Sequence, residues 1–264
     1  MAWELFPQDL ELGQTIGGGK FGKVYEGLLN DQKVAIKTMR KKSDPAALAE
    51  FRREAAVMSQ LQHQNVIQLL GVVLNQHPPL LIMELMGACF LDLLKRCTLS
   101  EKDILDCALQ IAAGLEYVHH SGYLHCDIAC RNVLVANSGR LVLGDLGLAR
   151  KMDSPECNLK GSKAKFPIRW TSPEVFQQQM LTRYSDIWSF GITLWEVVTQ
   201  GGVPYEGLTN KEAKRTVKEG NTPGRPSNCP NSLYNIMQQC WRTPAEQRPH
   251  FDDLVHELIS LKIN

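Results

Sequence analysis

The chain has 264 residues, which is enough for one large domain or two packed lobes with a sizeable core. Its formal net charge of +1 provides no basic surface of the kind that binds nucleic acid or an anionic membrane, and no apolar run approaches the roughly 18 residues that a membrane-spanning helix needs. Eight cysteines are scattered without a Cys-x-x-Cys pair, a pattern typical of reduced thiols. We therefore expect a cytoplasmic globular protein.

A glycine-rich turn follows the first predicted strand. Residues 10–16 alternate as a half-buried strand, residues 17–22 read GGGKFG, and β-prone residues resume at Lys23. In a dinucleotide-binding unit this glycine pattern opens a helix, so the hairpin that follows here argues against a Rossmann oxidoreductase. We expect instead a flap between two antiparallel strands, where bare backbone can approach phosphate groups closely.

Further strands are predicted over 33–37, 66–73 and 80–84. A helix is predicted over 46–61, because this segment is rich in Ala, Leu, Glu and Arg and lacks Gly and Pro. Glu54 lies beside the apolar stripe of that helix, and a carboxylate near a buried face needs a cation. Lys37, at the end of an apolar strand, is the obvious partner, although a lysine that shields a sheet edge is the more ordinary interpretation.

After a connector at 85–88 the pattern becomes helical, with helices predicted over 90–97 and 100–119. Ser100, followed by Asp103, is a typical N-cap signal for the second of these helices. The rest of the chain is predicted to be mainly helical.

Residues 123–135, YLHCDIACRNVLV, place one acid, one arginine and one amide on a short polar turn. The apolar runs on both sides predict buried strands, and rigid flanks around exposed polar groups suit an active site. Taken alone, the stretch fits a surface turn with chance polar residues equally well.

Eight motifs in order along the chain resemble those of the protein kinases, specifically the cytoplasmic tyrosine kinases of the Src and Abl type. They are GGGKFG-KV, VAIK, Glu54, HCDIACRN, DLG, SPE, DIWSFG and CW-x6-RP-x-F. The resemblance implies an α+β, two-lobed protein-kinase fold, with a five-stranded antiparallel sheet and one helix in the N-lobe and a mainly helical C-lobe. The implied bounds are about 1–85 for the N-lobe, 84–88 for the hinge and 89–264 for the C-lobe.

The resemblance also implies the parts of a site that transfers a phosphoryl group from ATP. Asp127 is then the base that accepts the proton of the attacking hydroxyl, with Arg131 directed toward the substrate. Lys37 holds the α- and β-phosphates and pairs with Glu54. The implied Mg²⁺ ligands are Asn132 and Asp145, which carry the hard oxygen atoms that this ion prefers. The implied nucleotide-binding residues are Ile16, Gly17, Gly18, Gly19, Lys20, Phe21, Gly22, Val24, Ala35, Lys37, Glu84, Met86 and Leu134.

Tyrosine is the acceptor that the resemblance implies. Serine/threonine kinases usually carry Lys two residues after the catalytic Asp, and this chain has Ala129 there, with Arg131 two residues further on. Residues 166–170, FPIRW, resemble the shelf on which tyrosine kinases pack the substrate ring. Protein substrates bearing tyrosine are the expected partners. By the same resemblance we expect a monomeric domain with regulatory modules outside this chain.

Other residues match structural positions of the family. Asp186 is expected to hold the catalytic loop through backbone N–H groups, and Glu174 and Arg248 are expected to form a buried ion pair. The residues that match the spine joining the lobes are Met58, Leu69, His125 and Leu146. His119 and His120 point to different faces of a helix, so we do not expect them to share a metal.

Three departures from the family stand out. Leu146 replaces Phe in the Asp-Phe-Gly motif, Cys126 replaces the Arg before the catalytic Asp, and no tyrosine lies between residues 145 and 174. The position of the family's autophosphorylated tyrosine falls at or next to Cys157. Because the missing arginine would pair with that phosphate, the last two departures explain each other. We hypothesise that activity does not depend on phosphorylation of this loop.

The cysteines and the altered motifs raise further interpretations. A disulfide between Cys126 and Cys157 is disfavoured, because an Arg–phosphotyrosine pair spans more than the roughly 7 Å that a disulfide allows between Cα atoms. Cys89, beside the nucleotide cleft, is the better candidate for a reactive thiol, although an inert thiol is the more ordinary interpretation. The altered motifs also raise a pseudokinase scaffold as the alternative function. We favour catalysis, since no polar role in phosphoryl transfer is vacant.

Overall fold

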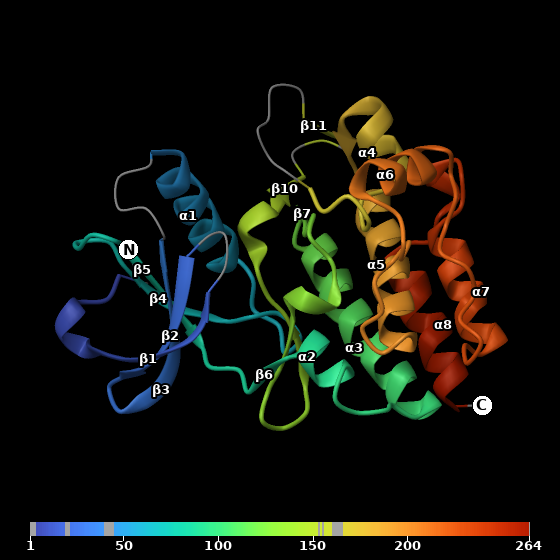
Figure 1. Ribbon diagram of the computed structural model, residues 1–264. Helices are drawn as coiled ribbons and strands as arrows, with labels where there is room; N and C mark the ends of the chain where they lie inside the picture. The colour runs from blue at the N-terminus through green and yellow to red at the C-terminus, as the bar shows by residue number, and fades with distance from the viewer. Residues whose placement is uncertain are drawn as a thin grey trace.

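The computed structural model describes residues 4–18, 22–39, 45–152, 154, 156–159 and 166–263. A small lobe with a β-sheet and one long helix lies beside a larger helical lobe, and the chain passes between them after β5 (Figure 1). The predicted two-lobed kinase fold is therefore confirmed. No helix in the described part of the chain combines the length and apolar character needed to cross a membrane.

The small lobe is built on a five-stranded sheet in the order β1-β2-β3-β5-β4, with all neighbours antiparallel. Its strands are β1 (Leu10–Gly18), β2 (Gly22–Leu29), β3 (Gln32–Met39), β4 (Leu69–Val73) and β5 (Leu80–Glu84). Strand β4 begins at Leu69, whereas the sequence predicted that it begins at residue 66. Val66 instead forms an isolated bridge to Leu143 in the other lobe. This bridge ties the two lobes together beside the cleft.

Helix α1 (Pro45–Met58) ends three residues before the predicted limit. The amides of Gln60 and Leu61 bond to carbonyls three residues back, at 3.0 and 3.2 Å, so the chain tightens after the helix. The buried face contains Phe51, Glu54, Val57 and Met58. The helix thus carries a carboxylate, Glu54, into the region between the lobes.

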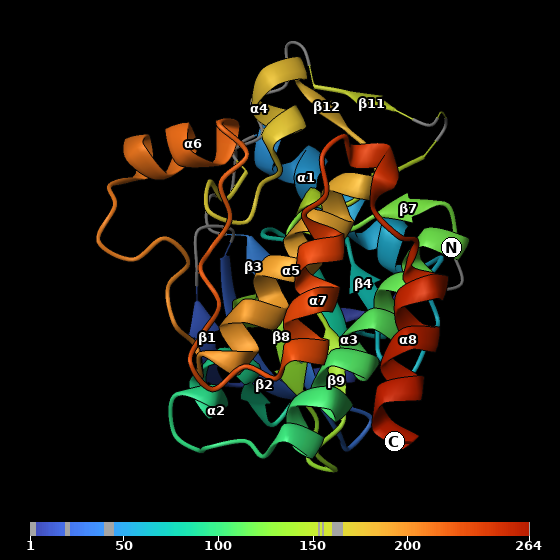
Figure 2. The same cartoon turned by 90° about the vertical axis from the view of Figure 1, so that its right-hand side faces the viewer.

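The larger lobe contains α2 (Phe90–Leu94), α3 (Glu101–His120), α4 (Pro173–Gln178), α5 (Arg183–Val198), α6 (Asn210–Lys218), α7 (Asn231–Cys240) and α8 (Phe251–Ile263). Helix α5 lies among α3, α7 and α8 (Figure 2) and is buried over most of its length. The predicted cap of α3 is confirmed, since Ser100 Oγ accepts the Asp103 N–H at 3.2 Å and Asp103 Oδ2 accepts the Ser100 N–H at 3.0 Å. Helix α2 is shorter than the predicted 90–97.

Short strands surround the polar loop of 123–135. β6 (Ala88–Cys89), β8 (Val133–Val135) and β9 (Leu141–Leu143) form one small sheet. β7 (Tyr123–Leu124) pairs with β10 (Arg150–Lys151), and β11 (Cys157–Asn158) pairs with β12 (Met180–Leu181). The strands on either side of the polar loop, β7 and β8, were predicted. Ala88 of β6 was assigned to the connector at 85–88, because a strand of two residues shows no alternation of apolar and polar residues.

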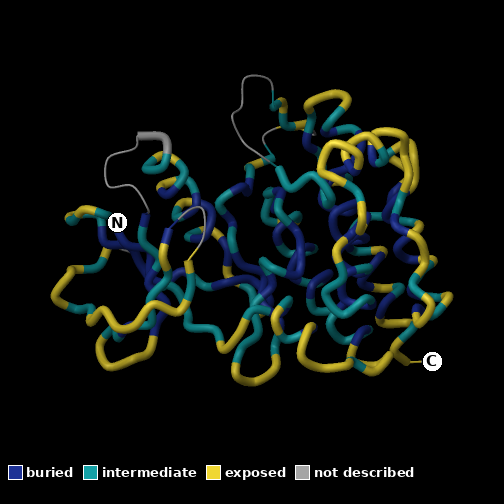
Figure 3. Tube along the Cα trace, in the orientation of Figure 1, coloured by how far each residue is buried: buried dark blue, intermediate teal, exposed yellow. Residues whose placement is uncertain are grey.

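Buried residues run through both lobes and meet between them (Figure 3). The largest apolar cluster includes three residues of the expected spine, Met58, Leu69 and Leu146, each at most 1% exposed. The buried ring of His125 lies next to it, with Nε2 3.2 Å from the Gly144 carbonyl oxygen. Leucine in place of Phe at 146 therefore remains part of the core.

Candidate active site

A cavity of about 620 Å³ lies between the lobes, a size that suits a small-molecule ligand. Ten of the predicted nucleotide-binding residues line it, namely Ile16, Gly17, Gly18, Gly22, Val24, Ala35, Lys37, Glu84, Met86 and Leu134. The other three, Gly19, Lys20 and Phe21, lie outside the described residues. The cavity also touches residues that sequence reasoning missed, among them Ile67 and Asn137, because neither belongs to a motif.

The described glycines of the flap differ in how much space surrounds them, so only one of them is required by the fold. A Cβ on Gly17 or Gly18 would meet its nearest neighbour only at 3.9 or 3.8 Å, so the fold leaves room at both positions. A Cβ on Gly22 would lie 1.6 Å from the Thr38 carbonyl oxygen on the adjacent strand. Gly22 is therefore required by strand packing, a reason that the glycine pattern alone did not reveal.

Three charged side chains meet at the inner end of the cavity. Lys37 Nζ on β3 lies 2.6 Å from Glu54 Oε1 on α1 and 3.4 Å from Asp145 Oδ1. Burial disfavours the charged lysine, but the two carboxylates outweigh it and hold the pKa of Lys37 above its ordinary value. The predicted Lys37–Glu54 pair is thus formed, and Lys37 carries its charge into the cavity.

Asp145 stands at a strained point of the backbone, with φ of 51° and ψ of 67°. A non-glycine residue in this left-handed region is typical of sites where the surrounding structure fixes an unfavourable conformation. The 3-10 helix η3 (Leu146–Leu148) follows it, and Arg53 Nη2 on α1 donates to the Gly147 carbonyl at 3.2 Å. The helix of the small lobe and the DLG motif are therefore locked together.

The residues expected to form the catalytic loop lie close together and bond to one another. The Arg131 guanidinium donates to the Asp127 carboxylate, and Asn132 Nδ2 donates to the Asp127 carbonyl at 2.7 Å. The short helix η2 (Cys130–Asn132) sets the spacing that lets both side chains reach back to Asp127. The amide nitrogen of Asn132 is used in this bond, which leaves its oxygen as the group able to bind a cation.

Asp186 on α5 holds the 123–135 loop through backbone N–H groups, as expected. Its carboxylate accepts the backbone N–H of His125 at 2.7 Å and that of Cys126 at 2.9 Å. Cys126 has φ of 67°, so these bonds fix a second left-handed residue beside Asp127. His119 Nε2 lies 3.0 Å from the same carboxylate, a partner that the sequence did not suggest, whereas His120 contacts a different aspartate at 2.9 Å. Burial opposes ionisation of Asp186, but His119 and the loop amides outweigh it and hold its pKa below the ordinary value.

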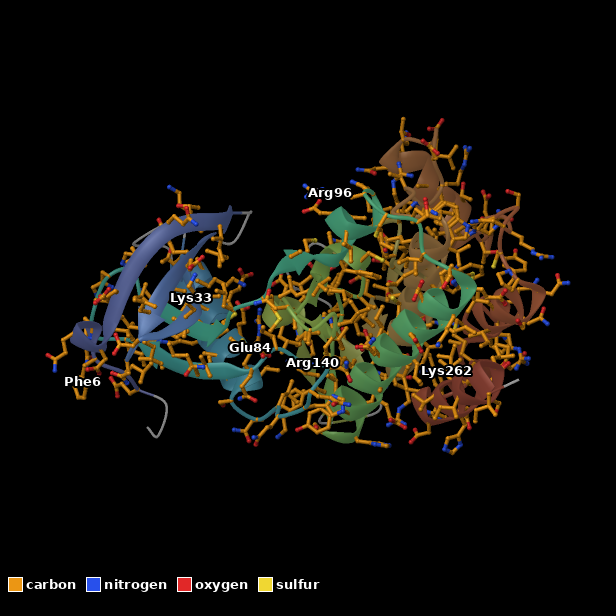
Figure 4. All side chains as sticks on the ribbon, turned by 90° about the horizontal axis from the view of Figure 1, so that it is seen from below. Phe6, Lys33, Glu84, Arg96, Arg140 and Lys262 are labelled. Atoms are coloured by element: carbon orange, nitrogen blue, oxygen red, sulfur yellow. The ribbon has the colours of Figure 1, made fainter. Side chains whose placement is uncertain are left out.

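The predicted hinge residue Glu84 is partly engaged within the protein. Its backbone N–H donates to the Gln68 carbonyl at 3.1 Å, and its side chain accepts the Gln68 N–H at 3.0 Å. The same carboxylate lies 3.5 Å from Arg140 of the other lobe, and both side chains stand at the junction between the lobes (Figure 4). Among the described residues, no hydrogen bond occupies the Met86 backbone, so Met86 retains both groups for a ligand.

The expected ion pair between Glu174 and Arg248 is present. Two guanidinium nitrogens of Arg248 donate to the two carboxylate oxygens of Glu174, at 2.7 and 3.0 Å, and Arg248 is almost fully buried. Burial opposes the Glu174 charge, but the bonds and charge of Arg248 outweigh it and lower the pKa of Glu174. This pair holds α4 on the body of the lobe.

All eight cysteines are free thiols. Cys126 lies in an apolar cluster with Leu124, Leu148, Val175 and Leu181, against which Met152, Cys157, Leu159 and Phe166 pack. We call these nine residues the thiol cluster. It occupies the place where the family pattern would put an arginine and a phosphotyrosine.

The chain belongs to the protein tyrosine and serine/threonine kinase family, whose sequence pattern matches residues 10–258. It is 38% identical over 264 residues to the tyrosine-protein kinase Fer of Rattus norvegicus and 37% identical to that of Homo sapiens; 98% of this chain and 32% of each of those proteins are covered. It is 34% identical to the tyrosine-protein kinase transforming protein Fps of an avian sarcoma virus, of which it covers 50%. The chain thus spans about a third of the length of the Fer proteins. Fer and Fps are thus among the relatives of this chain, and the finer likeness to Src and Abl stays a prediction.

Proposed function

We propose that this chain is a protein-tyrosine kinase, which transfers the γ-phosphoryl group of ATP to the hydroxyl of tyrosine in protein substrates with the aid of Mg²⁺. The observation that carries the proposal is that Lys37, Glu54, Asn132 and Asp145 line one cavity between the lobes, and that Asn132 bonds to Asp127. These side chains come from four separate segments, since Asp127 and Asn132 share one loop, and each is of the type that phosphoryl transfer needs.

The cleft fits ATP and Mg²⁺. Apolar residues of both lobes, Val24, Ala35 and Leu134, line the cavity and would enclose the adenine ring, while charged groups gather at one end for the phosphates. Asn132 offers an amide oxygen and Asp145 a partly exposed carboxylate, the hard oxygen ligands that Mg²⁺ prefers. When bound, Mg²⁺ supplies positive charge that stabilises the transferring phosphoryl group.

Asp127 is the proposed base, and the Arg131 guanidinium, which donates to its carboxylate, orients it. The loop that carries Asp127 is fixed through Asn132 on one side and Asp186 on the other, so the carboxylate does not have to be positioned at each turnover. Lys37 binds phosphate oxygen atoms, and its position is set by Glu54. The similarity to the tyrosine-protein kinases Fer and Fps supports tyrosine as the acceptor, together with Ala129 and the FPIRW segment.

We further infer that loop phosphorylation is not needed for activity. The described part of the loop is held by the thiol cluster and by backbone bonds, including Met152 N–H to the Gly122 carbonyl and Leu159 N–H to the Gln179 carbonyl, both at 2.8 Å. Apolar burial at this place does for the loop what a phosphate–arginine pair does in relatives that carry both. A guanidinium at 126 would be buried without a counterion.

The experiment is a peptide assay with ATP and Mg²⁺, comparing a tyrosine peptide with its phenylalanine and serine analogues. We expect phosphate transfer to the tyrosine peptide alone, and its loss in Asp127→Asn. Incorporation no greater than in Asp127→Asn would favour the pseudokinase scaffold. A second preparation is fully dephosphorylated before the assay. A collapse of its rate would contradict the inference about loop phosphorylation.

The remaining expectations about cellular context belong to the same proposal. Protein substrates bearing tyrosine, regulatory modules outside this chain, a cytoplasmic location and a monomeric domain are what the family likeness suggests. The 32% coverage of the Fer proteins supports the presence of further modules in relatives of this type. Size-exclusion chromatography of the purified chain tests the monomer.

A further inference from the structure

Helix α6 carries a row of exposed cations along one face. The four side chains are spaced at i, i+3, i+4 and i+7, which aligns them on a helix; they are Lys211, Lys214, Arg215 and Lys218. A different face of the helix is buried through Ala213 and Val217. The near-neutral net charge of +1 therefore conceals a local concentration of positive charge.

Folding accounts for only part of this row. Cations three and four residues apart on a helix repel one another. Arg215 and Lys218 lie in the last turn, where the helix dipole favours positive charge, but Lys211 lies in the first turn, where the dipole opposes it. Arg215 Nε lies 3.9 Å from Glu219, whereas the three lysines of the row make no ion pair within the described part of the chain. These lysines are available to a partner.

The start of α6 is tied to the FPIRW segment. Arg169 Nη1 donates to the carbonyls of Pro204 and Tyr205, at 2.6 and 2.7 Å. Its Nη2 donates to the Leu208 carbonyl, and the next residue, Thr209, is the N-cap of α6. One guanidinium thus fixes the helix relative to the surface that is expected to receive the substrate tyrosine.

Helix α4 holds the rest of α6. Lys214 Nζ lies over the Phe176 ring, 4.9 Å from its centroid, a cation–π contact. Gln177 Nε2 donates to the Lys218 carbonyl at 2.8 Å. The two helices lie next to each other at the outer edge of the larger lobe (Figure 2). Because α4 follows closely after Trp170, the row of cations has a fixed place beside the FPIRW segment.

We propose that these four cations form a docking surface for an acidic segment of the protein substrate, separate from the tyrosine that accepts the phosphoryl group. The inference rests on the proposed function, because it concerns the substrate of the same site. From Lys211 to Lys218 the helix rises about 10 Å, the length of about three residues of extended chain. A short run of Asp or Glu matches this length and charge, whereas one face of a nine-residue helix offers a membrane little area.

The test uses two tyrosine peptides that differ only in their ends, which carry runs of four Glu or of four Gln on flexible Gly/Ser linkers. The parent should show a kcat/KM about ten-fold higher for the Glu peptide, through KM, since three exposed ion pairs each contribute a factor of about two to three. The combined change Lys211→Gln, Lys214→Gln and Lys218→Gln should reduce this preference below about two-fold and leave the Gln peptide unaffected. In the parent, the preference should also disappear at about 1 M salt, where exposed charges are screened within about 3 Å.

The matched control combines Lys95→Gln, Arg96→Gln and Lys102→Gln. These side chains are also exposed, and they lie at the end of α2 and the start of α3, at the other end of the larger lobe (Figure 1). The control removes the same number of charges and should keep the ten-fold preference. Equal losses in the two triple variants would mean that net charge alone attracts the peptide, and the proposal would be wrong. A preference that survives the change on α6 would also overturn it.

Peptide binding without ATP, measured by fluorescence anisotropy, separates this inference from the proposed function. A parent that transfers no phosphate would contradict the kinase, yet about ten-fold weaker binding of the Glu peptide to the α6 variant would still support docking. Vesicles of phosphatidylserine test the other anionic surface. Vesicle binding that depends on the three lysines, without any peptide preference, would assign the row to a membrane and overturn the proposal.

The melting temperature distinguishes docking from a structural role of the row. We expect no decrease in the α6 variant, because the change removes repulsion between neighbours on the helix. A lower melting temperature, with a proportionate loss of activity toward both peptides, would make the row merely structural and would contradict the proposal.

Discussion

Replacing Asp186 with Asn tests how the catalytic loop is held. The Asp186 carboxylate receives three hydrogen bonds, from the amides of His125 and Cys126 and from the His119 ring. An Asn side chain has one oxygen and one NH₂ group. Because a backbone N–H cannot turn away, at least one of the two amides then faces another donor.

The cost follows from these contacts. A buried N–H without an acceptor costs about 1–3 kcal/mol, and the remaining bonds lose their charge-assisted character, so we expect Asp186→Asn to lower the free energy of unfolding by about 2–4 kcal/mol. Placing the NH₂ opposite Cys126 is the least costly choice, because the oxygen then still serves His125 and His119. The left-handed conformation of Cys126 would lose its support, and that residue adjoins Asp127.

Urea denaturation measures the stability, and peptide phosphorylation is assayed at a temperature where both proteins remain folded. We expect kcat to fall at least ten-fold. Thr193→Val is the control, because the buried Thr193 hydroxyl donates at 2.8 Å to the Ser189 carbonyl within α5, and it should stay close to the parent in both measurements. An unsatisfied buried amide costs about 1–3 kcal/mol, so a free energy of unfolding within about 1 kcal/mol of the parent's would refute the reasoning. So would full activity.

Three further predictions follow from the same contacts. Lys37→Met should lower kcat about 100- to 1,000-fold in the peptide assay while circular dichroism stays unchanged, and retained activity would remove Lys37 from the mechanism. Glu174→Gln should cost about 3–5 kcal/mol in urea at pH 7, because it leaves Arg248 buried without its partner. The pKa of Glu174 in the folded protein is lower than its ordinary value of 4.5, so its contribution to stability is fully present above pH 4.5 and is lost as the pH falls through the folded-state pKa. The free energies of unfolding of Glu174→Gln and of the parent should therefore converge in acid. A difference that stays constant with pH would contradict this. Iodoacetamide at pH 8 should label the exposed Cys97 but spare Cys126 in the folded protein, because burial holds the pKa of the Cys126 thiol well above its ordinary value, and comparable labelling by mass spectrometry would contradict it.

Motifs with a local cause were predictable from the sequence. The hairpin around the glycines follows from short β-prone runs and turn residues, and the cap of α3 follows from Ser100 and Asp103. Even the Lys37–Glu54 pair was within reach, because a carboxylate beside an apolar stripe requires a cation. Family resemblance then placed Asp186 and the Glu174–Arg248 pair correctly, since these positions stand in motifs of fixed spacing.

The tertiary structure alone decided what depends on distant segments. Strand β6 exists because β8 pairs with it, and Gly22 is required because β3 passes close by. Glu196 looks in the sequence like any acid in an amphipathic helix. Its Oε2 atom accepts the backbone N–H of Cys130 and the indole N–H of Trp170, which lie 66 and 26 residues away along the chain. No local pattern encodes such convergence. The sequence by itself determined which chemical groups the chain carries; the fold decided which of them share one atom.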